Sequence, residues 1–199
     1  MKGTLIIVTI FMAGIIISYS ISIPIWMHSS EFQTLILLIL LCLVGIGIGA
    51  ENGISSLFKS ISFATLTLPF LIILGSLIGG YLAAFLTSEV STKESIAIAS
   101  GMGYYSLSSI LLSKLCNEQI GTMALIANLF REISTILFFP LIVQLFGKYG
   151  GIASGGATSM DTTLPLIIKH SGKEMTIAAI YTGLVITILV PMIISIVMG

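Results

Sequence analysis

Two acidic residues lie inside apolar stretches of this chain, where a charge has no bulk water to hydrate it. Glu132 stands near the middle of the stretch 119–147, and Asp161, the only aspartate, lies within the stretch 149–168. A charge at the centre of a membrane helix costs about 2.5–3.5 kcal/mol on insertion scales, so such a residue faces a bundle interior or a wet cavity. Carboxylates placed there can bind an ammonium group or carry a proton. Which acid does which stays open.

The only arginine of the chain, Arg131, directly precedes Glu132. Asn128 and Glu132 are four residues apart and share one helix face, whereas Arg131 and Glu132 diverge by about 100°. We therefore expect Arg131 to meet an acid on another helix. We take Asn128, Arg131 and Glu132 as candidate substrate- or proton-binding residues; the alternative is a buried ion pair that only fixes helix register.

The stretch that carries Asp161 is a poor lipid-facing helix. It contains four glycines, five hydroxyl side chains and Pro165 between residues 149 and 168. Irregular backbone survives at membrane depth only where protein or water satisfies its polar groups. We expect a broken helix that crosses the membrane, with the backbone around 155–163 lining a cavity and with Ser159 and Thr162 among the binding residues. A soluble connecting loop is the alternative.

A second interrupted stretch, 99–109, precedes the Glu132 helix. Two glycines and four serines fall in the middle of its hydrophobic run. Paired interruptions of this kind are the best sequence pointer to the midplane site of a transporter. Tyr104 or Tyr105 can offer an aromatic face to an ammonium, although an interfacial or packing role is favoured for a tyrosine here. Ser106 is a further candidate.

Composition places the whole chain in a lipid bilayer. Of 199 residues, 56% are hydrophobic and only 8% are charged, against about 25% charged in soluble domains. The basic and acidic residues cancel, which removes any whole-chain argument for a nucleic-acid partner. The continuous apolar runs favour helices over a membrane β-barrel. The fold class predicted is an all-α integral membrane protein forming a single transmembrane domain over 1–199.

Each long apolar run can cross a bilayer once, since a spanning helix needs about 20 residues. We expect about seven transmembrane helices, two of them broken, and a first helix that is retained rather than cleaved. The glycine pairs Gly45/Gly49 and Gly75/Gly79 have the GxxxG spacing that lets helices approach closely. The candidate crossings are 3–30, 32–50, 60–88, 95–113, 119–147, 149–168 and 175–199.

Lysines in the short loops predict the orientation. With a cytoplasmic amino terminus, five lysines fall inside and only Lys93 and Lys148 fall outside, which the positive-inside rule favours. The carboxyl terminus is then outside. If 149–168 were re-entrant, the split would become three against four, so the count favours a full crossing there.

Other chemistry finds little support. Intramembrane aspartyl proteolysis needs two aspartates, and His28 and His170 lie apart with no nucleophile motif beside them. No phosphate-binding loop occurs. We read Cys42 and Cys116 as packing residues. The sequence therefore predicts no enzyme, no metal site and no cofactor.

Four stretches resemble the lysine exporter LysO family. They are residues 43–48, 99–109, 128–133 and 155–165, and the resemblance runs from about residue 30 to the carboxyl terminus. It implies a secondary transporter of the inner or plasma membrane that exports L-lysine and close analogues, coupled to an ion or proton gradient. The functionally important membrane acids of the family match Glu132 and Asp161.

Full-length members of that family carry an additional amino-terminal helical portion with a further membrane acid, which this sequence lacks. The resemblance thus implies a small companion membrane polypeptide, or a homo-oligomer, as partner. Backbone amides at a broken-helix amino terminus would suit the carboxylate of lysine. The rival interpretation is a non-transporting assembly or regulatory subunit of a transporter complex.

Overall fold

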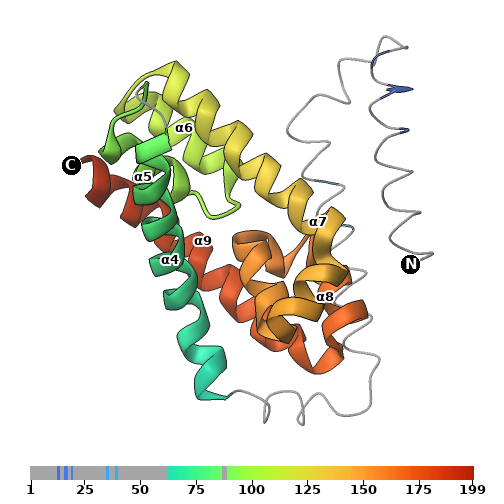
Figure 1. Ribbon diagram of the computed structural model, residues 1–199. Coiled ribbons are helices and arrows are strands. Elements are labelled where there is room, and N and C mark those ends of the chain that lie inside the picture. Colours follow the sequence, from blue (N-terminus) through green and yellow to red (C-terminus); the bar gives the residue numbers. More distant parts are fainter. Residues whose placement is uncertain are drawn as a thin grey trace. The chain divides into compact units, whose positions relative to one another are not determined.

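The computed structural model describes residues 62–86 and 89–199, besides a few isolated positions nearer the amino terminus. The chain divides into two compact units, 1–54 and 55–199, and the elements below belong to the second. These residues form helices and no strand (Figure 1). The helices are α4 (Phe63–Ala83), α5 (Thr92–Ala99), α6 (Tyr105–Leu115), α7 (Glu118–Gly155), α8 (Leu164–Ser171) and α9 (Thr176–Met198), with 3-10 turns η2 (Ala84–Leu86), η3 (Gly156–Met160) and η4 (Lys173–Met175).

Three stretches of this part are long and apolar enough to cross a membrane: Phe63–Leu86, Glu118–Met160 and Lys173–Met198. They confirm the helical membrane class. The expected crossings at 3–30 and 32–50 lie outside the described residues, so the total of seven stays a prediction in that part of the chain.

The interrupted stretch 95–113 folds as a helical hairpin. Ser91 caps α5 in a reciprocal bond pair with Glu94, and Lys93 at this start donates to the Met198 carbonyl at the end of α9, 3.1 Å away. The chain turns back at residues 100–104, and α6 then returns along α7, where a Cβ on Gly121 would collide with Ser113. Breaking of this stretch is confirmed, but its expected single crossing is wrong.

The stretch 149–168 forms a second hairpin. Gly147 adopts a left-handed backbone (φ +74°) that divides α7 into a long helix and a short arm, Lys148 to Gly155. The chain turns through η3 and leaves along α8. The arms run antiparallel, because Lys148 at the entrance pairs with Glu174 beyond the exit and a Cβ on Gly151 would lie 3.3 Å from the Ser171 hydroxyl. The expected full crossing is therefore wrong, since both arms are short and their outer ends meet.

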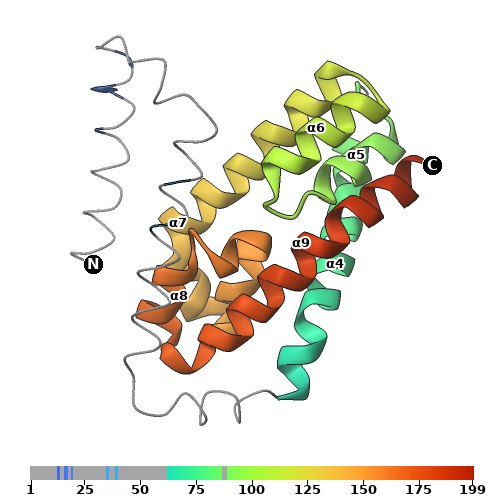
Figure 2. The same ribbon diagram turned by 180° about the vertical axis from the view of Figure 1, so that it is seen from behind.

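The two hairpins enter from opposite ends of the bundle, and their tips meet (Figure 2). The first starts where α9 ends, at Met198, and the second closes where α9 begins. At the tips, the Ala157 amide donates to the Met102 carbonyl over 2.9 Å. Each tip follows the same sequence, Ile-Ala-Ser-Gly, at 98–101 and again at 152–155. A long helix followed by a hairpin is thus repeated in inverted orientation, the arrangement typical of secondary transporters.

Backbone freedom at the tips explains their glycines. Gly103 (φ +95°) and Gly156 (φ +62°) lie in the left-handed region, which glycine enters without steric cost. A Cβ on Gly156 would also lie only 2.4 Å from the Met102 carbonyl oxygen. Glycine at 156 is therefore required both by its dihedral angle and by the contact between the hairpins.

Candidate functional site

Helix α7 holds the first hairpin through Asn128, which is 3% exposed. Its Oδ1 accepts from the Gly103 amide at 2.8 Å, and its Nδ2 donates to the carbonyls of Ala124 (2.9 Å) and Ile98 (3.3 Å). All three bonds go to backbone atoms, two of them at the hairpin tip. Asn128, expected among the binding residues, therefore has a positioning role in this structure.

Arg131 holds the second hairpin. Its Nε donates to the Ser154 carbonyl (3.1 Å), its Nη2 to the Ala153 carbonyl (2.9 Å) and its Nη1 to the Ser76 hydroxyl (3.4 Å). The two carbonyls end the short helical arm, where the helix dipole is negative. The expectation of an acid on another helix is thus wrong within the described residues. Helix-terminal carbonyls take that place.

Glu132 is the next residue of α7 after Arg131 and lies four residues after Asn128. It is 9% exposed, and its carboxyl group lies beside the Thr162 side chain and within electrostatic range of Asp161. Asp161 itself accepts from the amide and, at 3.4 Å, from the hydroxyl of Thr162. Tyr105, at the start of α6, is within electrostatic range of both acids. The structure therefore brings Glu132, Asp161, Thr162 and Tyr105 together.

The remaining predicted residues are less concentrated. Ser159 is fully buried, and its hydroxyl lies 2.7 Å from the Gly156 carbonyl and 2.8 Å from the Ala179 carbonyl, either of which can accept its one proton. Ser159 therefore joins the second tip to α9. Tyr104 is the residue before α6 and makes no capping side-chain bond, and Ser106, two residues later, is exposed. Ser159 therefore stabilises the fold, whereas Tyr104 and Ser106 flank Tyr105 at the start of α6.

Two residues of the Arg131 clamp were not predicted from the sequence. Thr135, buried on α7, donates to the Ser154 carbonyl at 3.0 Å and so shares the clamp of Arg131. Its signal was available, since it lies four residues after Arg131 and seven after Asn128 on one helix face. Ser76 on α4 had no comparable signal, because a lone serine in an apolar run is common.

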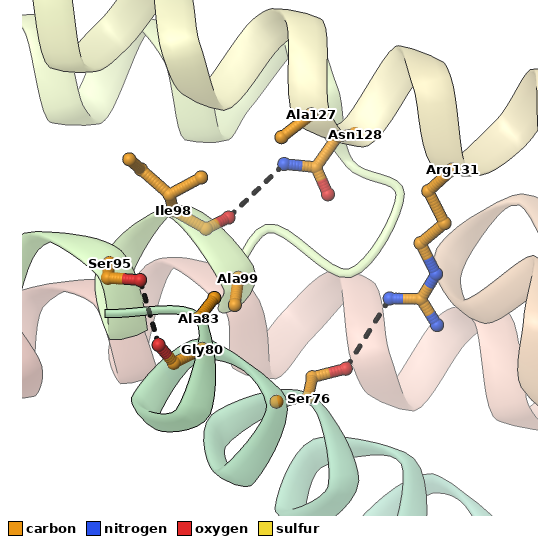
Figure 3. A pocket seen from close by; sticks show the side chains of 10 residues that line it. Ser76, Gly80, Ala83, Ser95, Ile98, Ala99, Ala127, Asn128 and Arg131 are labelled. Atoms are coloured by element: carbon orange, nitrogen blue, oxygen red, sulfur yellow. Dashed lines mark hydrogen bonds between the residues drawn. The ribbon is translucent and has the colours of Figure 1, made fainter. Parts of the chain in front are cut away.

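A crevice opens between α4 and α7 beside the Arg131 clamp (Figure 3). Two cavities, of about 300 and 330 Å³, adjoin there, and both are lined by Ser76 and Arg131. The first extends toward α5 and the second toward the short arm of the second hairpin, at Ala153. Figure 3 shows Arg131 reaching from α7 toward Ser76 on α4.

Comparison with known proteins decides the family. The model of the family described as "Lysine exporter LysO" matches residues 8–198, nearly the whole chain. The chain belongs to the lysine exporter LysO family. The resemblance carried by the four sequence stretches is thus confirmed. The family is described as an exporter, which is a transporter and not an enzyme.

Two relatives show how this LysO-family chain compares in length. It is 34% identical over 168 residues to the lysine exporter LysO of Escherichia coli (strain K12), and these residues make up 84% of this chain and 55% of that protein. It is 37% identical over 168 residues to a Haemophilus influenzae protein named "Putative lysine exporter", covering 84% and 85% of the two chains. The chain thus spans about half the length of the E. coli relative. No solved structure matches it.

Proposed function

We propose that this protein is a secondary transporter subunit that exports L-lysine, and close analogues, from the cell through the cytoplasmic membrane. Membership of the lysine exporter family supports the substrate. The observation that carries the proposal is that Glu132 and Asp161 lie within electrostatic range of each other, near the tips of two opposed hairpins. Two carboxylates at this depth suit a substrate with two ammonium groups.

Each acid has a role available to it. Glu132 is buried on the long part of α7, whereas Asp161 lies in the turn between η3 and α8 and is partly exposed. We assign ammonium binding to the pair, with one member carrying the coupling proton when lysine is absent. Tyr105 adds an aromatic ring beside them, which favours a cation at that point.

The arrangement of lysines supports an orientation. Three of them, Lys148, Lys169 and Lys173, lie at the end where the second hairpin enters, and two, Lys93 and Lys114, lie at the opposite end. The positive-inside rule makes the first end cytoplasmic. Since α9 ends beside Lys93, the carboxyl terminus is outside. A cytoplasmic amino terminus remains a prediction outside the described residues.

A companion membrane polypeptide or a second copy of the chain is part of the proposal. Its support is that the E. coli relative is nearly twice as long as the stretch this chain matches. The charge of Arg131 no longer argues for it, because helix-terminal carbonyls already contact the guanidinium.

The rival is a subunit that assembles a transporter without conducting lysine. Glu132→Gln separates the two roles, because the amide keeps the shape of the side chain and removes its charge. A transporting subunit loses most lysine efflux at equal membrane abundance. A scaffold keeps its efflux as long as the complex still assembles, and exposed Glu118→Gln provides the control that should change neither.

A further inference from the structure

Arg131 has hydrogen-bonding capacity that the fold does not use. A guanidinium group carries five N–H donors, and three of them account for its bonds to Ser154, Ala153 and Ser76. One N–H remains on each terminal nitrogen. The bond to Ser76 is also long, at 3.4 Å. A planar pair of free donors is the geometry that binds a carboxylate in two places at once.

The charge of Arg131 is likewise unmatched among the described residues. No ion pair reaches Arg131 in the part of the chain that the structure describes; the pair between Lys148 and Glu174, both about half exposed, lies at the far end of the second hairpin. The partners of Arg131 are neutral carbonyls and a hydroxyl. A cation held away from water gains most from a charged partner, provided the pair is well hydrogen-bonded.

Space for that partner exists on both sides of the guanidinium. The crevice cavities of about 300 and 330 Å³ meet at Arg131 and Ser76 (Figure 3). Gly75 and Gly79 form part of the α4 wall, and a Cβ added to either would meet nothing within 4 Å. The small residues therefore keep the crevice open instead of packing helices together within this part of the chain.

We propose that this crevice is a binding site for the carboxylate of the transported amino acid, with Arg131 as its anchor. The inference rests on the proposed function and names the group that recognises the other end of the substrate. Arg131 and Glu132 are consecutive on α7, so partners for the carboxylate and for an ammonium lie within one helical turn. Selection of an amino acid over a plain diamine follows from this pairing.

The sequence makes a direct test possible because Arg131 is the only arginine. Phenylglyoxal, which modifies guanidinium groups, therefore reports on one site when the labelled protein is analysed by mass spectrometry. The protein is labelled in native membranes with lysine, 6-aminohexanoate or cadaverine present. The first two carry a carboxylate, and cadaverine keeps both amines of lysine but lacks it.

Lysine and 6-aminohexanoate should slow the modification of Arg131 by about tenfold at about ten times their Kd, whereas cadaverine should leave it unchanged. Equal protection by cadaverine, or no protection by either carboxylate, overturns the proposal. An arginine that resists labelling without ligand overturns it too, since the crevice would then be closed.

Variants of one position give a second, independent readout. Gly79→Leu fills the crevice and should abolish protection by carboxylates, whereas Gly79→Ala should retain it, because the added methyl meets open space. If carboxylates protect Arg131 equally in both variants, the crevice is not the binding site. The two hypotheses fail separately: carboxylate protection without any lysine efflux refutes the export function alone, and efflux without carboxylate protection refutes this site alone.

Discussion

Glu132 and Asp161 lie on two different elements, and the contacts of the adjacent residues Arg131 and Thr162 position them. Glu132 follows Arg131, whose clamp on the carbonyls of Ala153 and Ser154 fixes the second hairpin against α7. Asp161 lies on that hairpin, beside Thr162. The distance between the acids therefore depends on the Arg131 clamp. Asn128, Arg131 and Thr135 on α7 thus hold the two hairpins beside Glu132 on the same helix.

Asn128→Ala tests the clamp on the first hairpin. The change leaves the buried Gly103 amide without its partner and removes one of the bonds to the Ile98 carbonyl, which still accepts from the Gly101 amide. An unsatisfied buried group costs about 1–3 kcal/mol. We expect the free energy of unfolding to fall by that amount, measured as thermal unfolding in detergent. Gln119→Ala, at an exposed position of the same helix, should change it by less than about 0.5 kcal/mol. Equal effects of the two variants would remove the positioning role of Asn128.

The sequence predicted the site acids because their charge is exceptional in an apolar run, and that exception requires a function or a partner. It predicted the wrong partner for Arg131 because spacing along α7 shows only where a side chain leaves the helix. The carbonyls at 153 and 154 become acceptors only when the chain reverses at Gly147. Ser76 contacts Arg131 only because α4 packs beside α7 in the folded chain.

At the element scale, the hairpins are the main departure from the expected fold. Glycines and hydroxyl residues in 99–109 and 155–163 predicted where the helices break, because they make a poor lipid-facing helix. A broken crossing and a hairpin have the same composition, however. The return of the second arm depends on the left-handed Gly147, the tip contact with Met102 and the pairing of Lys148 with Glu174.

Two neighbouring glycines of α4 give a matched prediction about how the first hairpin packs. A Cβ on Gly80 would lie 2.7 Å from the Ala99 Cβ and 2.9 Å from the Ile96 Cα, whereas one on Gly79 would meet nothing within 4 Å. Gly80→Ala should lower the free energy of unfolding by about 1–3 kcal/mol through overpacking. Gly79→Ala should leave it unchanged or raise it by about 0.5–1 kcal/mol, because alanine favours a helix. Thermal unfolding in detergent compares them; a Gly79 variant as unstable as the Gly80 variant would contradict the packing of α5 on α4.

For the whole molecule, the inverted repeat determines which ends of the helices share a side of the membrane. Both hairpins return to the side they came from, so only α4, the long part of α7 and α9 change sides between residues 62 and 199. With the orientation proposed from the lysines, the carboxyl terminus lies outside; the sequence predicts the same side from seven full crossings, whereas the structure reaches it with three membrane-length helices in this part of the chain.

Cysteine labelling tests that orientation. In a variant without Cys42 and Cys116, a cysteine at Gly199 should react with an impermeant maleimide in intact cells, and one at Lys169 should react only after the cells are opened. The physical reason is that α9 separates these two positions by the thickness of the bilayer. Reaction of both from the same side would contradict the second hairpin.

Lysine efflux tests the central claim most directly. The protein, together with any polypeptide that co-purifies with it from its native host, is expressed in cells that lack their own lysine exporter, and release of preloaded radioactive lysine is followed. We predict efflux with the natural chain and loss of at least about 90% of its rate with Asp161→Asn at equal membrane abundance, because the amide keeps the shape of the side chain and removes its charge. An Asp161→Asn variant that exports lysine at the rate of the natural chain would contradict the account.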